Sequence, residues 1–272
     1  MQPPRLTAKS PLFKYAYIGS YSNGGSESNI ENTLRTLSTL AMIENWEYGK
    51  TPNDRSLPIL YNYLIHTFTR IEEENKIAER DNYSCFNTGL VTENQEEIFM
   101  LFGRNRTKDS WKFLEFCKES SNDLTRFNPL PERAKYFNDP SELIYDTRLE
   151  LRINIDHIVM DADNFARFPE DIQKLPQHQL INTFHGAVDH AKKRVKRNYL
   201  TAIPQYYRGQ YFPNGQLQLL LPLCLTDPSR ADLALAVYKQ DDIYSGRTCL
   251  TLDMAINNAR LITKPDDEWL KP

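Results

Sequence analysis

Short apolar and aromatic runs, separated by polar turns, constrain the fold of this chain more than any other feature. In the first half these runs are CFNTGLV, EEIFMLFGRN and WKFLEFCKES, which begin at residues 85, 96 and 111. Strand-length segments at this spacing predict an antiparallel meander. A second set lies between residues 200 and 240 and predicts a second strand block: LTAIPQYY, GQLQLLLPLCL and ADLALAVYKQ.

Helical periodicity marks the segments around these blocks. Apolar residues recur every three or four positions in residues 30–45, 57–78 and about 179–198. The segment RTCLTLDMAINNARLI turns from strand to helix near Asp253. Helices and strands therefore fall into separate groups, which predicts an α+β fold with helices near the N-terminus and two antiparallel strand blocks joined by a basic helix.

Length and linker composition predict the domain organisation. A chain of 272 residues buries roughly three quarters of its unfolded surface, so a core forms without disulfides or metals. We expect an irregular N-terminal segment over residues 1–29 and a single compact domain over residues 30–272. Three prolines mark residues 120–142 as a loop: Pro129, Pro131 and Pro140.

Composition excludes several classes of protein. With 33 Lys and Arg against 36 Asp and Glu, the net charge of -3 is unlike that of a basic polyanion-coating protein or a disordered chain. The longest uncharged apolar run, Leu217–Leu225, is too short to span a bilayer, so we expect no membrane partner and a cytoplasmic location. The four cysteines lack zinc or redox spacing and are expected to be reduced core thiols.

The strongest local bias is a basic segment, residues 189–208. It carries a net charge of +5, which leaves -8 for the remainder of the chain. One interpretation is an ordinary solvated helix end, where the helix dipole favours cations. The other is a phosphate-binding surface, because a bound polyanion relieves the repulsion between clustered cations and the nearby tyrosines can stack on bases. The residues of this hypothesis are Lys192, Lys193, Lys196, Arg197, Tyr206 and Tyr207.

A second group of polar residues lies around a predicted half-buried strand, Leu149–Ile158. Arg152, Asn154 and Asp156 share its polar face. If the strand stops before His157, that side chain is free to act as a general acid or base, since its unperturbed pKa lies near 6.5. The alternative is a hydrogen-bonded structural histidine.

Other signals are weaker. The polar triplet Asn87-Thr88-Gly89 interrupts an apolar run and predicts a bulge or a ligand contact. Asp253 and Arg260 share a face of the predicted C-terminal helix. No glycine-rich phosphate loop and no nucleophile elbow occur in the sequence. No cofactor is expected, and a divalent metal is possible but unsupported by ligand spacing.

The chain as a whole resembles the family catalogued as domain of unknown function 3825. The resemblance rests on CFNTGLVTENQEEIFMLF, LPERAKYFNDPSELIYD, INIDHI, AKKRVKRNYLTAIPQYY, QLQLLLPLCL and LTLDMAINNARLITKPDDEWL, and it covers roughly residues 30–272. It implies a shared fold and no established activity. Some larger members carry RNA-associated domains, which points in the same direction as the basic segment.

The resemblance also implies a set of site candidates, which are the polar positions that recur in the family. In this sequence they are Asn87, Thr88, Gly89, Arg133, Asn154, His157, Arg167, Lys193, Arg197, Asn198, Gln205, Tyr207, Asp253, Asn258 and Arg260. We expect them to converge on the rim of one pocket.

Together these observations predict a nucleotide- or RNA-binding domain whose partner is a nucleotide or single-stranded RNA. Arg167 and the basic segment would hold phosphates, and Tyr206 and Tyr207 would stack a base. His157 would be the catalytic residue if the protein hydrolyses a phosphoester bond. The alternatives are a non-enzymatic protein-interaction module and a metal-dependent hydrolase.

Overall fold

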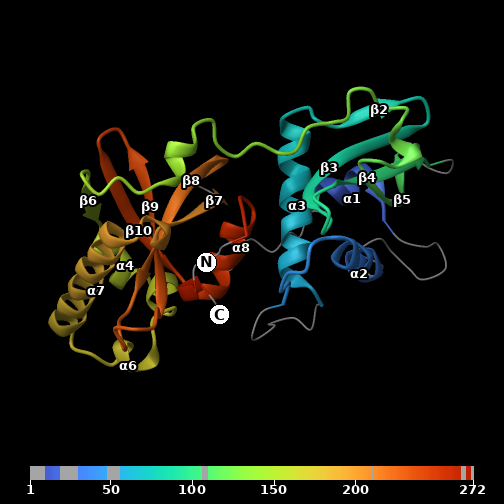
Figure 1. Ribbon diagram of the computed structural model, residues 1–272. Helices are drawn as coiled ribbons and strands as arrows, with labels where there is room; N and C mark the ends of the chain where they lie inside the picture. The colour runs from blue at the N-terminus through green and yellow to red at the C-terminus, as the bar shows by residue number, and fades with distance from the viewer. Residues whose placement is uncertain are drawn as a thin grey trace. The chain divides into compact units, whose positions relative to one another are not determined.

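A computed structural model describes residues 10–18, 30–47, 56–105, 110–209, 211–264 and 268–270. The chain forms two compact units, one within residues 4–135 and one within residues 136–272, each with its own five-stranded sheet (Figure 1). The predicted α+β class is confirmed. The boundaries predicted for a single domain, residues 30–272, stay a prediction. The border between the units falls in the segment that the prolines marked as a loop.

The first unit contains the predicted meander. Its helices and strands are α1 (Pro11–Tyr15), β1 (Ala16–Tyr17), α2 (Ile30–Leu40), α3 (Pro58–Glu73), β2 (Ala78–Arg80), β3 (Tyr83–Val91), β4 (Glu97–Arg104), β5 (Trp111–Lys118) and the 3-10 turn η1 (Asn122–Leu124). The strand order is β1-β5-β4-β3-β2, with β1 parallel to β5 and the other pairs antiparallel. Helix α3 is shorter than predicted because Asn75, with φ of 54°, leaves the helical conformation.

Both faces of this first sheet are covered at its central strands, β3 and β4. On one face Phe68 of α3 meets Phe86 of β3 with ring centroids 5.2 Å apart. On the other face Leu124 and Phe127, which follow β5, pack with strand residues Cys85, Phe99, Leu101 and Cys117. Strand β4 is therefore buried from Ile98 to Gly103, and its apolar run is continuous rather than alternating.

The second unit repeats this strand order. Its helices and strands are η2 (Pro140–Leu143), β6 (Glu150–Ile153), α4 (Ile155–Met160), α5 (Ala162–Phe165), α6 (Glu170–Gln173), α7 (Gln177–Arg197), η3 (Tyr199–Thr201), β7 (Ile203–Gly209), β8 (Phe212–Leu223), β9 (Leu233–Gln240), β10 (Ile243–Leu250), α8 (Leu252–Arg260) and η4 (Glu268–Leu270). The order is β6-β10-β9-β8-β7, and β6 is parallel to β10. In both sheets the first strand in the chain lies at an edge and is followed by helices. It pairs in parallel with the last strand of the antiparallel meander that comes after those helices.

The predicted strand Leu149–Ile158 is wrong beyond Ile153. The side chain of Asn154 accepts a hydrogen bond from the backbone N–H of His157 at 3.0 Å and so caps the start of α4. Asn154 thus ends the alternating segment that forms β6 and begins α4. His157 consequently lies in a helix and not at a strand end.

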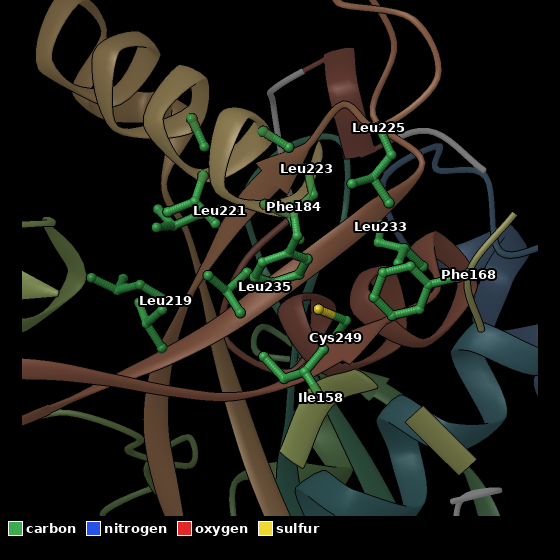
Figure 2. Close-up of a cluster of buried hydrophobic side chains, with 14 of the residues drawn as sticks. Ile158, Phe168, Phe184, Leu219, Leu221, Leu223, Leu225, Leu233, Leu235 and Cys249 are labelled. Atoms are coloured by element: carbon green, nitrogen blue, oxygen red, sulfur yellow. The ribbon is translucent and has the colours of Figure 1, made fainter. Parts of the chain in front are cut away.

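Helices α7 and α8 pack against opposite faces of the second sheet. Phe184 of α7 lies among Leu219, Leu221 and Leu235, as Figure 2 shows. The intervening residues of the same strands face α8, and they pack with Ala255, Ala259 and the C-terminal Trp269: Ile203, Leu220, Ala234, Ala236 and Leu250. The alternation of side chains along each strand therefore produces two cores, one on each side of the sheet.

Candidate functional site

Four cations form an exposed surface on the last turns of α7. Lys192, Lys193, Lys196 and Arg197, which we call the α7 cationic surface, all point to solvent because the buried stripe of the helix occupies the intervening positions. None of the four forms an ion pair with any residue that the structure describes. The helix dipole favours these charges, but nothing described neutralises them.

The chain that leaves α7 extends this surface with apolar groups. The Asn198 side chain accepts a hydrogen bond from the Leu200 N–H at 3.1 Å and so caps the turn η3. The capped turn presents Tyr199, 60% exposed, and Leu200, 59% exposed. An exposed ring thus follows the cations directly. In contrast, Arg194 is half-buried, with Nη1 3.6 Å from Cys224 Sγ.

Tyr206 and Tyr207 lie on opposite faces of the second sheet, so they cannot stack one base together, and that expectation is corrected. The Tyr206 ring meets Tyr136 at 4.9 Å, and its hydroxyl donates to the Asn214 carbonyl at 2.8 Å. Tyr207 faces the other side, where its ring lies 6.3 Å from that of Phe212.

Two predicted site residues meet in a buried chain of amides. Asn258 Nδ2 donates to Gln205 Oε1 at 3.1 Å, although 53 residues separate them. Gln205 Nε2 donates in turn to Gln218 Oε1 at 2.7 Å. Gln205 is fully buried and Gln218 is 6% exposed. Sequence reasoning missed Gln218, because its only signal is its position opposite Gln205 across β7 and β8, which requires the strand register.

Arg167 is a half-buried link and not a free phosphate ligand. Its Nη1 donates to the Cys249 carbonyl at 2.6 Å and to Asn164 Oδ1 at 3.0 Å. Burial lowers the pKa of the guanidinium, an effect opposed by nearby Cys249, Asp161 and Asp163. These bonds attach α5 to the end of β10, and no described contact joins Arg167 to the α7 cationic surface.

His157 has no assembled catalytic partner among the described residues. Its ring is half-buried in α4, and no carboxylate or hydroxyl of the described chain forms a hydrogen bond with it. Asn154 serves the backbone of α4 as its cap. A general base normally needs a group that orients it, so the geometry gives His157 no more than an accessible nitrogen.

The remaining C-terminal candidates lie on α8. Asp253 occupies its first turn and Arg260 its last residue, and both are half-buried. Asn257 Nδ2 donates to the Asp253 carbonyl at 2.9 Å, so that amide serves its own helix. Asn258, on the same helix, is joined to another predicted residue, Gln205.

The triplet Asn87-Thr88-Gly89 forms a bulge inside the first unit. Asn87 Nδ2 donates to Glu97 Oε2 at 2.9 Å, and the Thr88 hydroxyl donates to the Ile98 carbonyl at 2.7 Å. Gly89 has φ of 74°, at the point where the register of β3 and β4 shifts. The predicted bulge is confirmed, and both polar side chains are buried and bonded within the unit.

Two further properties concern metals and membranes. Among the residues that the structure describes, no three His, Cys, Asp or Glu side chains gather as a metal would require. No described helix combines the length and the apolar character needed to cross a membrane. All four cysteines are free thiols, three of them buried.

Comparison with known proteins gives a family and no activity. No curated protein and no solved structure matches the chain. The family described as Domain of unknown function (DUF3825) matches residues 37–269, most of the sequence and parts of both units. The chain therefore belongs to the family of domain of unknown function 3825, as its sequence motifs predicted.

Proposed function

We propose that the second unit binds single-stranded RNA through phosphates held at the α7 cationic surface. The observation that carries this proposal is the group of four exposed cations without an ion pair among the described residues. Their mutual repulsion costs free energy that a bound polyanion recovers. Each contacted phosphate releases counterions from the nucleic acid, which adds a favourable entropy.

Tyr199 and Leu200 support this ligand over a simple inorganic anion. Both side chains are more than half exposed and directly follow the cations. A tyrosine ring beside phosphate-binding groups can stack on an unpaired base, and stacking of this kind tolerates any base. The proposed activity is therefore binding with little sequence preference at this surface.

The proposal concerns binding and assigns no catalytic step. Phosphoester hydrolysis would require His157 to act on a substrate held elsewhere, and no described partner group orients its ring. We infer a cytoplasmic location as part of the same proposal. The free cysteines support it, because thiols of this kind persist in a reducing compartment.

The test is a titration of labelled single-stranded RNA with the full chain at several salt concentrations. The logarithm of the affinity should fall with the logarithm of the salt concentration by about 0.7 per phosphate contacted. Neutralising the surface with Lys192→Gln, Lys193→Gln, Lys196→Gln and Arg197→Gln should reduce this slope by up to about 2.8.

A matched variant separates a local site from net charge. Arg35→Gln, Lys118→Gln, Arg230→Gln and Lys264→Gln remove four exposed cations from other parts of the chain. The salt slope of this variant should differ from that of the wild type by no more than about 0.7, the share of one phosphate contact. The proposal would be refuted if both variants reduced the salt slope equally, or if the wild type bound no RNA, DNA or mononucleotide at low salt.

A further inference from the structure

The α8 side of the second sheet has an uncovered region. Helix α8 packs over Ile203, Leu220 and Ala236, and further along the same face the side chains become half-exposed. We call this region the open sheet face: Tyr207, Phe212, Gln216, Tyr238 and Ser245. Strand pairing places them on one side, since Tyr207 pairs with Gln216 and Tyr238 with Ser245. Tyr207 and Tyr238 lie an even number of residues from Ile203 and Ala236, so they face the same side as these residues under α8.

Three aromatic rings form a continuous row on this face. The ring centroids of Tyr207 and Phe212 are 6.3 Å apart and those of Phe212 and Tyr238 are 5.2 Å apart, both edge to face. Gly209 leaves room for the first ring, since a Cβ there would lie 2.7 Å from Tyr207 Cζ. Tyr211, in the turn between β7 and β8, is 75% exposed. The rings of β7, β8 and β9 are thus half-exposed, and because neighbouring rings stand nearly perpendicular, a base can stack on one of them at a time.

A solvent-accessible amide donor lies at the edge of this row. Gln218 Oε1 accepts from Gln205, which directs its Nε2 away from the amide chain. That Nε2 donates to no described residue, although the side chain is only 6% exposed. Leu219 of β8 pairs with Val237 of β9. The next position in the same register places Gln218 opposite Tyr238. Water can reach this Nε2 group, and an acceptor atom of a stacked base can take the place of that water.

A pocket with two guanidinium groups adjoins the row at its other end. Its volume is about 530 Å³, and its lining includes Arg152, Asn154, Asp156, Ser245 and Arg247. Arg152 is already paired with a carboxylate of its own strand. Arg247, the extra residue of a bulge in β10, is exposed and has no described ion pair. Since Ser245 belongs to both the pocket and the open sheet face, a phosphate at Arg247 would lie beside a base on the rings.

The geometry points to a nucleotide-binding site on the open sheet face, distinct from the α7 cationic surface. An unpaired base stacks on Tyr238, beside the Phe212 ring, and accepts a hydrogen bond from Gln218 Nε2, while Arg247 holds the adjoining phosphate. The site lies on the side of the sheet opposite to α7. It shares the class of ligand with the proposed function but none of its residues.

The test maps where a base contacts the protein. A short oligouridylate that carries one 5-iodouridine is irradiated with the full chain, and the cross-linked peptides are identified by mass spectrometry. We expect cross-links on Tyr207, Tyr211, Phe212 or Tyr238. In parallel, an oligomer with abasic sites should bind about tenfold more weakly than the intact one, because stacking of a base is lost.

Two variants connect the result to the rings. Phe212→Leu with Tyr238→Leu keeps apolar side chains in place but removes the stacking surface, and should abolish the cross-links on the open sheet face and reduce the preference for the intact oligomer. Tyr238→Phe keeps the ring and should behave as the wild type, which shows that the ring and not the hydroxyl is needed. Arg247→Gln should weaken binding and lower the salt slope by about 0.7, the share of one phosphate.

The outcomes separate this site from the α7 cationic surface. Cross-links that persist on the open sheet face when the four α7 cations are neutralised support the sheet site, even if the salt slope refutes the α7 surface. Cross-links confined to Tyr199 would refute the sheet site and leave the α7 surface standing. Equal affinity for intact and abasic oligomers would also refute it.

Discussion

The two units use one strand order to build sheets of opposite character. In the first unit the central strand β4 is buried along almost its whole length, with α3 on one face and the segment after β5 on the other. In the second unit the first half of β8 is half-exposed, and only its second half is buried. The same topology is therefore compatible with a closed sheet and with an open one.

The difference lies in what covers each sheet beyond its middle. Helix α8 has nine residues and covers only part of its face. Where the cover ends, buried leucine gives way to glutamine, tyrosine and arginine. Polar and aromatic side chains thus accumulate in the second unit where the sheet is open, while the polar pair Asn87 and Thr88 in the first unit is buried and bonded internally.

Truncation of one ring in each sheet, buried in the first and half-exposed in the second, tests this contrast most strongly. Phe86 is fully buried and meets both Phe68 and Phe102, so Phe86→Ala should lower the free energy of unfolding by about 3–5 kcal/mol. Tyr238→Ala, on the open face, should cost about 1 kcal/mol. Urea denaturation measures both. Similar losses would mean that the second sheet is as closed as the first.

Glycine substitutions compare the two sheets at a smaller scale. Gly89 has φ of 74°, and a Cβ there would lie 2.6 Å from the buried Tyr63 hydroxyl, so Gly89→Ala should cost about 2 kcal/mol. Gly209→Ala meets the half-exposed Tyr207 ring, which can move outward, and should cost less than half as much. A larger loss at Gly209 in thermal denaturation would show that the Tyr207 ring is fixed.

The amide chain tests whether polar groups belong to the core of the second unit. Gln205→Leu leaves Asn258 Nδ2 and Gln218 Oε1 without their partner, and should destabilise the protein by about 1–2 kcal/mol. Gln216→Leu, on the same face but half-exposed, serves as the control and should stay within about 0.5 kcal/mol of the wild type. Equal effects would place Gln205 in contact with solvent.

The smallest effect is expected on the outer face of α7. Gly186 is exposed, and a Cβ there would have no neighbour within 4 Å. Gly186→Ala should raise the free energy of unfolding by about 0.5–1 kcal/mol through helix propensity, and should leave RNA binding unchanged. Destabilisation would indicate that this face packs against something other than solvent.

Sequence periodicity was sufficient for the elements that form by local rules. The helical period of residues 179–198 predicted α7 and its buried stripe, since residues three and four apart share a face. The short apolar runs and the polar turns between them predicted the meander of β3, β4 and β5. The cap of α4 by Asn154 was missed because strand alternation and a helix start both begin with the same apolar-polar pattern.

The candidate site was less accessible to sequence reasoning, because it depends on contacts between distant segments. Gln218 becomes informative only when β8 is placed opposite β7 and α8 above them. The parallel pairs β1–β5 and β6–β10 join strands that lie far apart in the chain, and local pattern carries no signal for them. For the same reason, the repeated strand order of the two units was not predicted.

The parallel edge strands have a consequence for folding during synthesis. Strand β1 finds its partner only after β5 has been made, and β6 only after β10, yet no strand of one unit pairs with a described strand of the other. The N-terminal sheet can therefore close before the second one exists as chain. At roughly 5–20 residues per second, translation of the second unit takes about 7–30 s, which gives the first unit time to complete its core alone.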